Sequence, residues 1–420
     1  MKALIITYYW PPAGGSGVQR WLYFTKYLRE FGIEPIIFTV EQPNYPITDK
    51  DLALQIPENI EVIRQKIWEP QNILGKKNKK TAAGFLQKNP NKTQRFIQYI
   101  RANYFIPDAK KYWINPSVRK LSKYLKQNPV DWIITTGPPH SVHLIGKKLK
   151  LKTKLKWLAD FRDPWTEIDY FHQLPLTKKS LRKHQQLENK VLTKADLVTV
   201  VGNSMRDKYQ KLNTNCHVIT NGFDDEGVVK DVTLDRLFSL THIGMLNADR
   251  NPLVFWKTIR TLLDDNDDFE KALKINLIGK IADEVKLSIR KYNLEKHISY
   301  TTYIPHNSVL KHQKKSQILL LFINQVPNAK GIITGKVFEY LQAKRPILAI
   351  APPDGDLAEI LNQTKSGKVV SFEDEIELKN TILSYFKDFK GGQLKVKSQN
   401  TAKYHRKNLT AQLAELLKNN

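Results

Sequence analysis

The sequence contains one cysteine, Cys216. A single cysteine excludes an intrachain disulfide framework and a zinc site built on several cysteines, and it is compatible with a reducing compartment. We expect Cys216 to be a small buried apolar residue.

Long apolar runs are also missing. No segment approaches the roughly 20 apolar residues needed to cross a bilayer. Met1 to Trp10 is apolar only briefly before Pro11 and Pro12, so it lacks the charged flank and apolar length of a signal peptide. We therefore expect a cytoplasmic protein, either free or attached peripherally to the inner face of the cell membrane.

Biased segments are absent as well. Of 420 residues, 41% are hydrophobic and 10% aromatic, with 19 glycines and 21 prolines. This composition is typical of a globular protein and excludes fibrous or largely disordered classes. The length exceeds what one hydrophobic core accommodates, so two domains of about 200 residues are expected.

Acidic residues are few relative to basic ones, and the formal net charge is +26. Residues 1–200 carry 34 basic and 16 acidic side chains, so most of the excess lies in the first half. Clusters occur at Lys76, Lys77, Lys79 and Lys80 and between Lys147 and Lys156. Such a surface attracts anionic lipid headgroups or nucleic acid without sequence preference, or it reflects a lysine-rich background on ordinary helices. Charge alone does not choose between these three readings.

The first half alternates strand-like and helical patterns. Lys2 to Tyr8 is a short apolar run, and apolar residues at helical spacing follow a loop rich in proline and glycine. Further strand-like runs are found at 35–40, 132–136, 155–160 and 197–201. This alternation predicts an open α/β sheet with parallel strands buried on both faces.

The pattern breaks at Asn221 to Asp235, where we place a hinge. Strand-like runs then return at 238–244, 273–279, 318–322 and 346–350. We therefore predict domains at 1–220 and 221–400. A leucine stripe in the last segment predicts a terminal helix within 401–420 that packs back on the first domain.

Residues 42–115 are the least regular part of the chain. They mix Pro, Asn and Lys with the aromatic residues Trp68, Phe85, Phe96, Tyr99, Tyr104 and Phe105. We read this stretch as loops and short helices whose aromatic side chains either shape an acceptor groove or pack internally, and the second reading is favoured.

Ligands of open α/β sheets bind beyond the carboxyl ends of the strands, so the loops after each strand are the place to look for function. The loop after the first strand contains Gly14, Gly15 and Gly17, and its amides could hold an anion with Ser16 capping the next helix. The alternative is an ordinary glycine-rich turn. The loop sequence does not match the GxGxxG dinucleotide fingerprint.

Two later loops of the first half carry polar groups. His140 lies at a helix start, where an imidazole tends to stay neutral and can hydrogen-bond a substrate hydroxyl, or it simply packs there. The next strand ends in DFRDPW. Asp160, Arg162 and Asp163 form either an internal ion network or a site whose carboxylate orients an acceptor hydroxyl.

The second half holds the most informative stretch, GIITGKVFEYLQAKRP. Its loop contains Gly331, Thr334 and Gly335, Lys336 begins the following helix, and Glu339 lies on the same helical face. Loop amides and Lys336 are suited to a phosphate, and Glu339 to ribose hydroxyls.

A second cation precedes this stretch. The strand 238–244 ends at Gly244, and Arg250 follows at the mouth of the next helix. An arginine there is suited to a diphosphate leaving group, and the alternative is a plain surface arginine.

Four motifs, taken together and in order, resemble the retaining family-4 glycosyltransferases of the GT-B architecture: YYWPPAGGSGVQR, DFRDPW, ITNGFD and TGKVFEYLQAKRPIL. The likeness extends over essentially the whole chain. It implies two Rossmann-like α/β domains with parallel sheets facing an interdomain cleft, with the donor held mainly by the second domain.

The resemblance also implies an activity. The implied reaction moves a sugar from a nucleoside diphosphate sugar to a hydroxyl of a glycan or lipid-linked acceptor with retention, without a cofactor or an obligatory metal. A bacterial enzyme of cell-surface polysaccharide or lipid-linked glycan synthesis is the leading hypothesis, with an anionic membrane surface as a partner of the basic first domain.

Residue roles carry over by position. Glu339 resembles the ribose-binding glutamate, Arg250 and Lys336 would hold the diphosphate, and Gly15 would let the first domain approach the donor. His140 resembles a donor-sugar or acceptor contact. The loop at Tyr303 and Ile304 would flank the nucleobase.

Two positions depart from the family pattern. Gly331 stands where the family commonly has a second glutamate that contacts the donor sugar, and Met245 where an arginine often follows the strand-ending glycine. The sugar is therefore left open, and Arg250 and Lys336 remain as the main cations.

Three other readings are kept beside this one. A nucleotide-sugar epimerase would share the fold, and a non-catalytic subunit would bind a sugar nucleotide without turnover. A basic nucleic-acid-binding protein would explain the charge. The sequence contains no recognised nucleic-acid-binding module, however, and we expect no specific nucleic acid as a partner.

Overall fold

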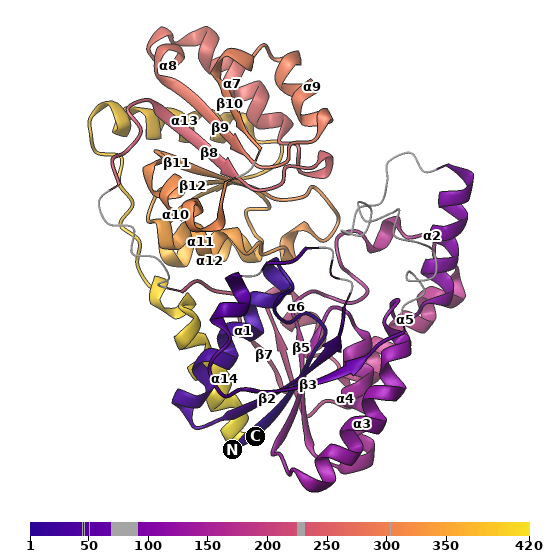
Figure 1. Cartoon of the computed structure of the whole chain (residues 1–420). Helices are drawn as coiled ribbons and strands as arrows, with labels where there is room; N and C mark the ends of the chain where they lie inside the picture. The colour runs from indigo at the N-terminus through magenta and orange to yellow at the C-terminus, as the bar shows by residue number, and fades with distance from the viewer. Residues whose placement is uncertain (44, 46, 50, 69–90, 225–231, 303) are drawn as a thin grey trace. The chain divides into compact units, whose positions relative to one another are not determined.

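The computed structural model describes residues 1–420 except 44, 46, 50, 69–90, 225–231 and 303. The chain divides into two compact units, Met1–Asn221 with Arg406–Asn420 (unit 1) and Gly222–His405 (unit 2). Each contains a parallel sheet with helices on both faces (Figure 1). The predicted fold class, two Rossmann-like α/β domains, is confirmed.

The sheet of unit 1 has seven strands in the order β3-β2-β1-β4-β5-β6-β7, and every pairing is parallel. The strands are β1 (Lys2–Thr7), β2 (Glu34–Glu41), β3 (Glu61–Lys66), β4 (Trp132–Gly137), β5 (Lys156–Phe161), β6 (Leu197–Val200) and β7 (Cys216–Val218). The helices are α1 (Ser16–Leu28), α2 (Lys92–Tyr104), α3 (Ile114–Gln127), α4 (Ser141–Thr153), α5 (Lys178–Leu192), α6 (Asn203–Tyr209) and α14 (Arg406–Asn419).

Alternation along the central strand explains the two cores of unit 1. Leu4 and Ile6 of β1 pack with α3, α4 and α5, whereas Ala3 and Ile5 pack on the opposite face with α1 and α14. Both faces are apolar because successive strand residues point to opposite sides of a sheet that is covered on both.

The last helix belongs to unit 1. Leu413 of α14 is buried in the core beside α1, and the Trp132 indole N–H donates to the Leu417 carbonyl oxygen at 3.0 Å. The chain therefore crosses between the units twice, near 221 and near 405. On the unit 2 side the two crossings pair, since the Phe223 N–H donates to the Tyr404 carbonyl oxygen at 3.1 Å.

The sheet of unit 2 has six parallel strands in the order β10-β9-β8-β11-β12-β13. They are β8 (Phe238–Ile243), β9 (Leu273–Ile278), β10 (Ile298–Thr301), β11 (Ile318–Phe322), β12 (Ile347–Ile350) and β13 (Gly367–Val370). The helices are α7 (Leu253–Asp265), α8 (Asp267–Ala272), α9 (Asp283–Lys291), α10 (His306–Lys315), α11 (Lys336–Ala343), α12 (Asp356–Thr364) and α13 (Glu375–Lys390).

Unit 2 repeats the same layering. Leu320 of β11 packs with α7, α9 and α13, and Leu319 and Leu321 pack on the other face with α11 and α12. β8 and β11 lie at the centre of the sheet, where the strand order reverses. The carboxyl ends of strands at such a reversal are the usual ligand position in this class of fold.

Some expectations need correction. The favoured internal packing of the aromatic side chains in 42–115 is wrong for Trp68, Phe96, Tyr99 and Tyr104, which are exposed. Phe85 and the predicted lysine cluster at 76–80 lie outside the described residues. Cys216 is buried as expected. None of the described helices is long and apolar enough to cross a membrane.

Candidate functional site

The turn after β8 forms the floor of the candidate site in unit 2. Gly244 has φ 114° and Gly279, after the neighbouring β9, has φ 125°, a region that glycine adopts readily. A Cβ on Gly279 would lie 2.5 Å from the Gly244 carbonyl oxygen, and a Cβ on Gly244 would lie 2.5 Å from Cε of Lys336. The two glycines thus let the strand ends and the lysine come together.

Lys336 is the first residue of α11 and lies over this turn. Its pKa is lowered to about 7, mainly by burial and then by the nearby Arg250, while Glu339 acts in the opposite direction. About half of the Lys336 side chains are therefore neutral at pH 7 when no anion is bound. An anion at the site would favour the charged form.

His242, inside β8, supports the lysine. Its Nδ1 lies 3.2 Å from the Leu320 carbonyl oxygen, which can only accept, so Nδ1 carries the hydrogen. Nε2 then faces the Lys336 Nζ at 3.5 Å with its lone pair. Burial and then Lys336 hold the His242 pKa well below its usual range, so the imidazole adds no charge.

Arg250 ends the short helix η7 (Ala248–Arg250) that follows the turn. Its Nε donates to the Asn324 side-chain oxygen at 2.9 Å, and its Nη1 lies 3.5 Å from the Met245 carbonyl oxygen. Asn324 is buried just after β11. Because Arg250 contacts residues that follow β8 and β11, and Lys336 lies over Gly244 after β8, both cations lie at the same edge of the sheet.

Glu339 lies one turn further along α11 and is half-buried. Its Oε2 accepts a 3.4 Å hydrogen bond from the side-chain amide of Gln313, a buried residue of α10. The carboxylate is close enough to raise the Lys336 pKa. A carboxylate accepts several hydrogen bonds, so Glu339 can still bind vicinal hydroxyls.

Helix α11 begins without a side-chain cap. Gly335 precedes Lys336 with φ −55°, and no side chain bonds to the first helical amides. A Cβ at Gly335 would have nothing within 4 Å. Thr334 is half-buried two residues before α11, and Gly331 ends the short helix η9 (Ala329–Gly331). The Val337 and Phe338 amides donate to the Thr334 and Gly335 carbonyl oxygens, so an anion in front of Gly335 would be attracted by the positive end of the helix dipole and by Lys336.

The structure describes only one of the two residues that are expected to flank the nucleobase. Ile304 is half-buried before α10, and Tyr303 lies outside the described residues. Their role stays a prediction.

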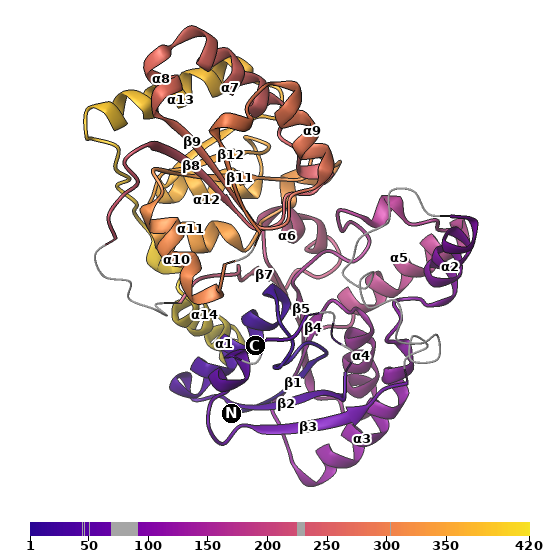
Figure 2. The same cartoon turned by 45° about the horizontal axis from the view of Figure 1, so that its top comes forward.

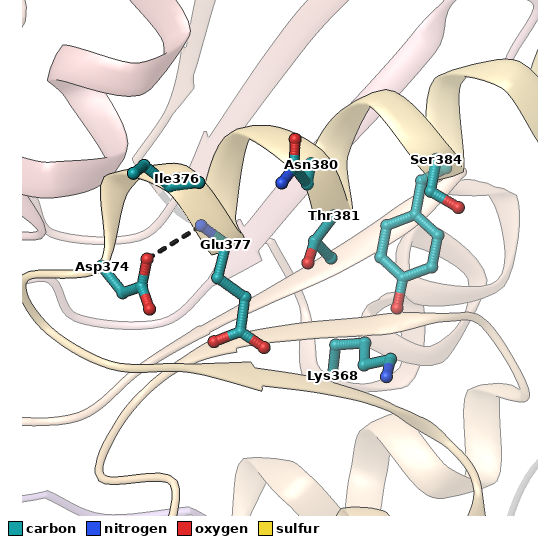
Figure 3. Close-up of a pocket in the computed structure, with 8 residues that line it drawn as sticks. Lys368, Asp374, Ile376, Glu377, Asn380, Thr381 and Ser384 are labelled. Carbon is teal, nitrogen blue, oxygen red and sulfur yellow. Dashed lines mark hydrogen bonds between the residues drawn. The ribbon is translucent and has the colours of Figure 1, made fainter.

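A different hollow of unit 2 contains none of the predicted residues. Figure 3 shows an open groove between β13 and α13, lined by Lys368, Asp374, Ile376, Glu377, Asn380, Thr381, Ser384 and Tyr385. The Asp374 carboxylate accepts from the Glu377 amide at 2.8 Å and caps α13. The groove therefore holds a helix cap rather than a convergent set of ligand-binding groups.

In unit 1 the glycine loop leads into α1. The Gly14 N–H donates to the Ile47 carbonyl oxygen at 2.9 Å, and a Cβ on Gly14 would lie 2.8 Å from the Ile47 side chain. Gly15 is exposed with φ 92° and precedes α1. The expected cap at Ser16 is wrong, because Ser16 is already the first helical residue and Gly15 occupies the cap position.

Asp160 is a structural residue of unit 1. It is fully buried and pairs with Arg20 of α1 at 2.8 Å, and it also accepts from Trp21, Thr136 and Thr199. Burial raises its pKa, but Arg20 outweighs this effect and the net pKa lies below its usual range. Asp160 thus joins three strands to α1.

Arg162 connects its own loop to other backbone segments of unit 1 through hydrogen bonds. Its guanidinium donates to the backbone carbonyl oxygens of Gly17, Gly137 and Pro138. The expected local network of DFRDPW is therefore only partly right, since the ion-pair partner of Asp160 is Arg20 rather than Arg162.

Asp163 is half-buried, whereas Asp160 is fully buried. Burial raises its pKa, Arg162 opposes this, and Asp169 raises the pKa further. A carboxylate with a raised pKa is a better proton acceptor, which suits contact with a hydroxyl group.

His140 precedes α4 and is buried. Its ring stacks on Trp165 with centroids 4.7 Å apart and planes at 4°, and its Nδ1 has no hydrogen-bond partner among the described residues. Burial, and secondarily His143, lowers the His140 pKa well below the usual range. The imidazole is therefore neutral and can exchange hydrogen bonds with a hydroxyl.

The structure thus brings Gly244, Arg250, Lys336 and Glu339 together in unit 2. In unit 1 the predicted residues follow three adjacent strands, with Gly14 and Gly15 after β1, His140 after β4 and Asp163 after β5. Sequence reasoning missed His242, Asn324 and Gln313, which contact the cluster from other elements. Among the described residues, no group of three or more His, Cys, Asp or Glu side chains is placed to hold a metal.

This fold and this cluster define a glycosyltransferase of the GT-B architecture. Residues 15–226 match the profile of Glycosyltransferase Family 4, just over half of the chain, and the chain belongs to that family. A search of curated sequences found no significant match.

Solved structures share the fold at low identity. A sucrose-phosphate synthase from Thermosynechococcus elongatus aligns with TM-score 0.62 and 14% identity, covering 100% of this chain and 98% of the other. WaaG, a glycosyltransferase involved in lipopolysaccharide biosynthesis, aligns with TM-score 0.56 and 11% identity over 100% of both chains. A TarM variant from S. aureus, in complex with fondaparinux, alpha-GlcNAc-glycerol and UDP, aligns with TM-score 0.58 and 12% identity over 99% of both.

Proposed function

We propose that this glycosyltransferase moves a sugar from a nucleoside diphosphate to a hydroxyl group and retains the anomeric configuration. The observation that supports the proposal most strongly is the clustering of Lys336, Arg250 and Glu339 around the start of α11. The two cations match a diphosphate, and the carboxylate matches ribose hydroxyls.

In this proposal the leaving diphosphate carries the developing negative charge. Lys336, Arg250 and the positive N-terminal end of the α11 dipole stabilise that charge as the glycosidic bond loosens. For retention the acceptor attacks the face from which the diphosphate departs. The positive charge comes from the protein, and no obligatory metal is invoked.

Unit 1 is proposed to serve the acceptor. Asp163 would accept a hydrogen bond from the attacking hydroxyl, and neutral His140 would position the acceptor or the donor sugar. Gly15 would allow close backbone approach to the donor. These roles rest on the side-chain environments described above and on the family resemblance.

The acceptor is proposed to be a cell-surface polysaccharide or a lipid-linked glycan. WaaG is described as acting in lipopolysaccharide biosynthesis, and the TarM variant was crystallised with a glycerol-linked sugar, which supports this direction. The basic first half of the chain fits a cytoplasmic enzyme that is peripheral on an anionic membrane surface.

The first test is a thermal-shift screen with UDP, GDP and ADP and their sugars. One nucleoside diphosphate should raise the melting temperature by mass action, and Glu339→Ala should remove this shift. Glu377→Ala, an exposed glutamate of α13, is the matched control and should keep it. No shift with any nucleotide contradicts the donor assignment.

The second test follows the anomeric proton of the product by NMR with the responding donor. Transfer or slow hydrolysis that keeps the donor configuration supports retention, and an inverted product contradicts it. Donor binding without turnover under any acceptor would indicate a non-catalytic subunit. Donor conversion to a different sugar nucleotide would indicate an epimerase. Nucleic-acid binding that Glu339→Ala leaves unchanged, without nucleotide binding, would indicate the third alternative.

A further inference from the structure

Helix α2 has an unusual environment for a 13-residue helix of a globular unit, because none of its residues is buried. Its sequence, KTQRFIQYIRANY, is nevertheless rich in apolar side chains. An amphipathic helix normally buries its apolar face against its own protein. The apolar residues of α2 instead remain in contact with solvent.

Four large apolar or aromatic side chains of α2 are exposed. Phe96 is 64% exposed, Ile97 51%, Tyr99 40% and Tyr104 63%. Scattered single apolar residues on a surface need no explanation, but a group on one short helix marks an interaction site.

A second aromatic group adjoins the end of α2. Trp68 is 52% exposed and packs edge-on against Tyr112, with centroids 4.7 Å apart. The Lys111 ammonium lies 5.0 Å from the Tyr112 ring and donates to the Tyr104 carbonyl oxygen. Aromatic rings interleaved with lysine are typical of side chains at the level of lipid headgroups.

The charge around this apolar surface is positive. α2 contains three exposed cations, Lys92, Arg95 and Arg101, and no acidic residue. Its Asn103 side chain bonds to the Pro175 carbonyl oxygen and to the Thr177 N–H, which fixes α2 beside the start of α5.

α5 extends the same basic surface. Its first turns expose Lys178, Lys179, Arg182 and Lys183, and its single acidic residue, Glu188, is buried. Both views show α2 alongside α5 in unit 1 (Figure 1 and Figure 2).

We infer that α2, the Trp68–Tyr112 aromatic pair and the first turns of α5 form a docking surface for an anionic lipid bilayer. Apolar side chains on α2 enter the headgroup region, and the flanking cations bind anionic headgroups. A nucleic acid would match the cations and could stack on aromatic rings, but it offers nothing to an exposed aliphatic side chain such as Ile97. The inference is independent of the donor site.

Trp68 makes the inference directly measurable. The other seven tryptophans, Trp10, Trp21, Trp113, Trp132, Trp157, Trp165 and Trp256, are at most 2% exposed. With vesicles of phosphatidylcholine and phosphatidylglycerol, the emission of the full-length protein should shift to the blue, and brominated lipids should quench it. Trp68→Phe should remove both signals while co-sedimentation with the vesicles continues.

Two double variants separate the apolar and electrostatic parts. F96S/I97S should raise the lipid concentration for half-binding at least about tenfold, since apolar insertion is lost. K178E/K179E should do the same and remove most of the salt dependence. Ile376→Ser, at an apolar residue 76% exposed on α13, and K395E/K397E are the matched controls and should bind as the wild type does.

Several outcomes would overturn the inference. They are absence of binding to anionic vesicles, binding that F96S/I97S does not weaken, or a Trp68 signal that duplex DNA reproduces and F96S/I97S abolishes. Glu339→Ala should still bind vesicles. Vesicle binding by a protein that binds no nucleotide would therefore refute the proposed function and leave the docking surface intact.

Discussion

The pKa of Lys336 predicts a pH-dependent affinity for the diphosphate. With a pKa of about 7 in the free protein, about half of the lysines are charged at pH 7 and about 1 in 100 at pH 9. If the bound diphosphate restores the ordinary lysine pKa, affinity should fall about 50-fold between these pH values, because only the charged fraction is competent. The terminal phosphate loses its last proton near pH 6, so the ligand changes little over this range.

Calorimetry can separate this effect from others. Titrating the responding nucleoside diphosphate at pH 8 in two buffers of different ionisation enthalpy should show uptake of about one proton per site. Lys336→Arg should bind with no proton uptake and a flat profile from pH 7 to 9, since a guanidinium stays charged. His242 does not titrate in this range because its pKa lies well below the usual value.

Two results would refute this reasoning. One is wild-type affinity that does not change between pH 7 and 9, and the other is the same pH dependence in Lys336→Arg. The free protein offers a separate check. The unfolded chain keeps the ordinary lysine pKa and binds more protons between about pH 7 and 10, so Lys336 should make the free energy of unfolding rise with pH in that window.

Three further substitutions test the geometry. Gly335→Ala should lower diphosphate affinity about tenfold, because a methyl group would enter the space in front of the amides. It should change the free energy of unfolding by no more than about 1 kcal/mol, because no atom lies within 4 Å of the new Cβ and φ is −55°. A loss of stability in urea unfolding would contradict this. Gly244→Ala should lower both stability and affinity, since φ is 114° and the new Cβ would meet Lys336, and an unchanged urea midpoint would contradict it. Asp160→Asn should cost about 3–5 kcal/mol in urea unfolding because it leaves Arg20 as an uncompensated buried charge, whereas a loss below about 1 kcal/mol would show that the pair contributes little.

The fold could be predicted where strands are central and apolar on both faces. The runs at 2–8, 132–136 and 318–322 correspond to β1, β4 and β11, which lie inside their sheets. The strands missed, among them β3 and β13, are edge strands with mixed composition. β3 reads EVIRQK and β13 reads GKVV, so neither shows a continuous apolar run.

The candidate site was predictable only where its residues are close in sequence. Lys336 and Glu339 could be paired from helical spacing alone. His242 reaches Lys336 from the middle of β8, and its neighbours Ser239 to Ile243 are all buried, so the strand pattern gave no reason to assign it a role. The same holds for Arg20, whose partner Asp160 lies 140 residues away and meets it only through the packing of α1 on the sheet.

Exposure of the α2 aromatics could not be predicted either. Phe96 and Ile97 are apolar like core residues, and only the structure shows that they are exposed and that none of the described elements buries them. Hydrophobicity predicts that a side chain will leave water, but it does not say whether the apolar partner is the same chain or a different surface.

The central claim is that unit 2 holds the donor diphosphate at the start of α11. A crystal structure of the protein with the nucleoside diphosphate identified by the thermal-shift screen tests it most directly. The account predicts a phosphate oxygen within hydrogen-bond distance of the Lys336 Nζ or the Arg250 guanidinium, with a ribose hydroxyl on Glu339. A nucleotide bound elsewhere, with Lys336 and Glu339 contacting only protein, would contradict it.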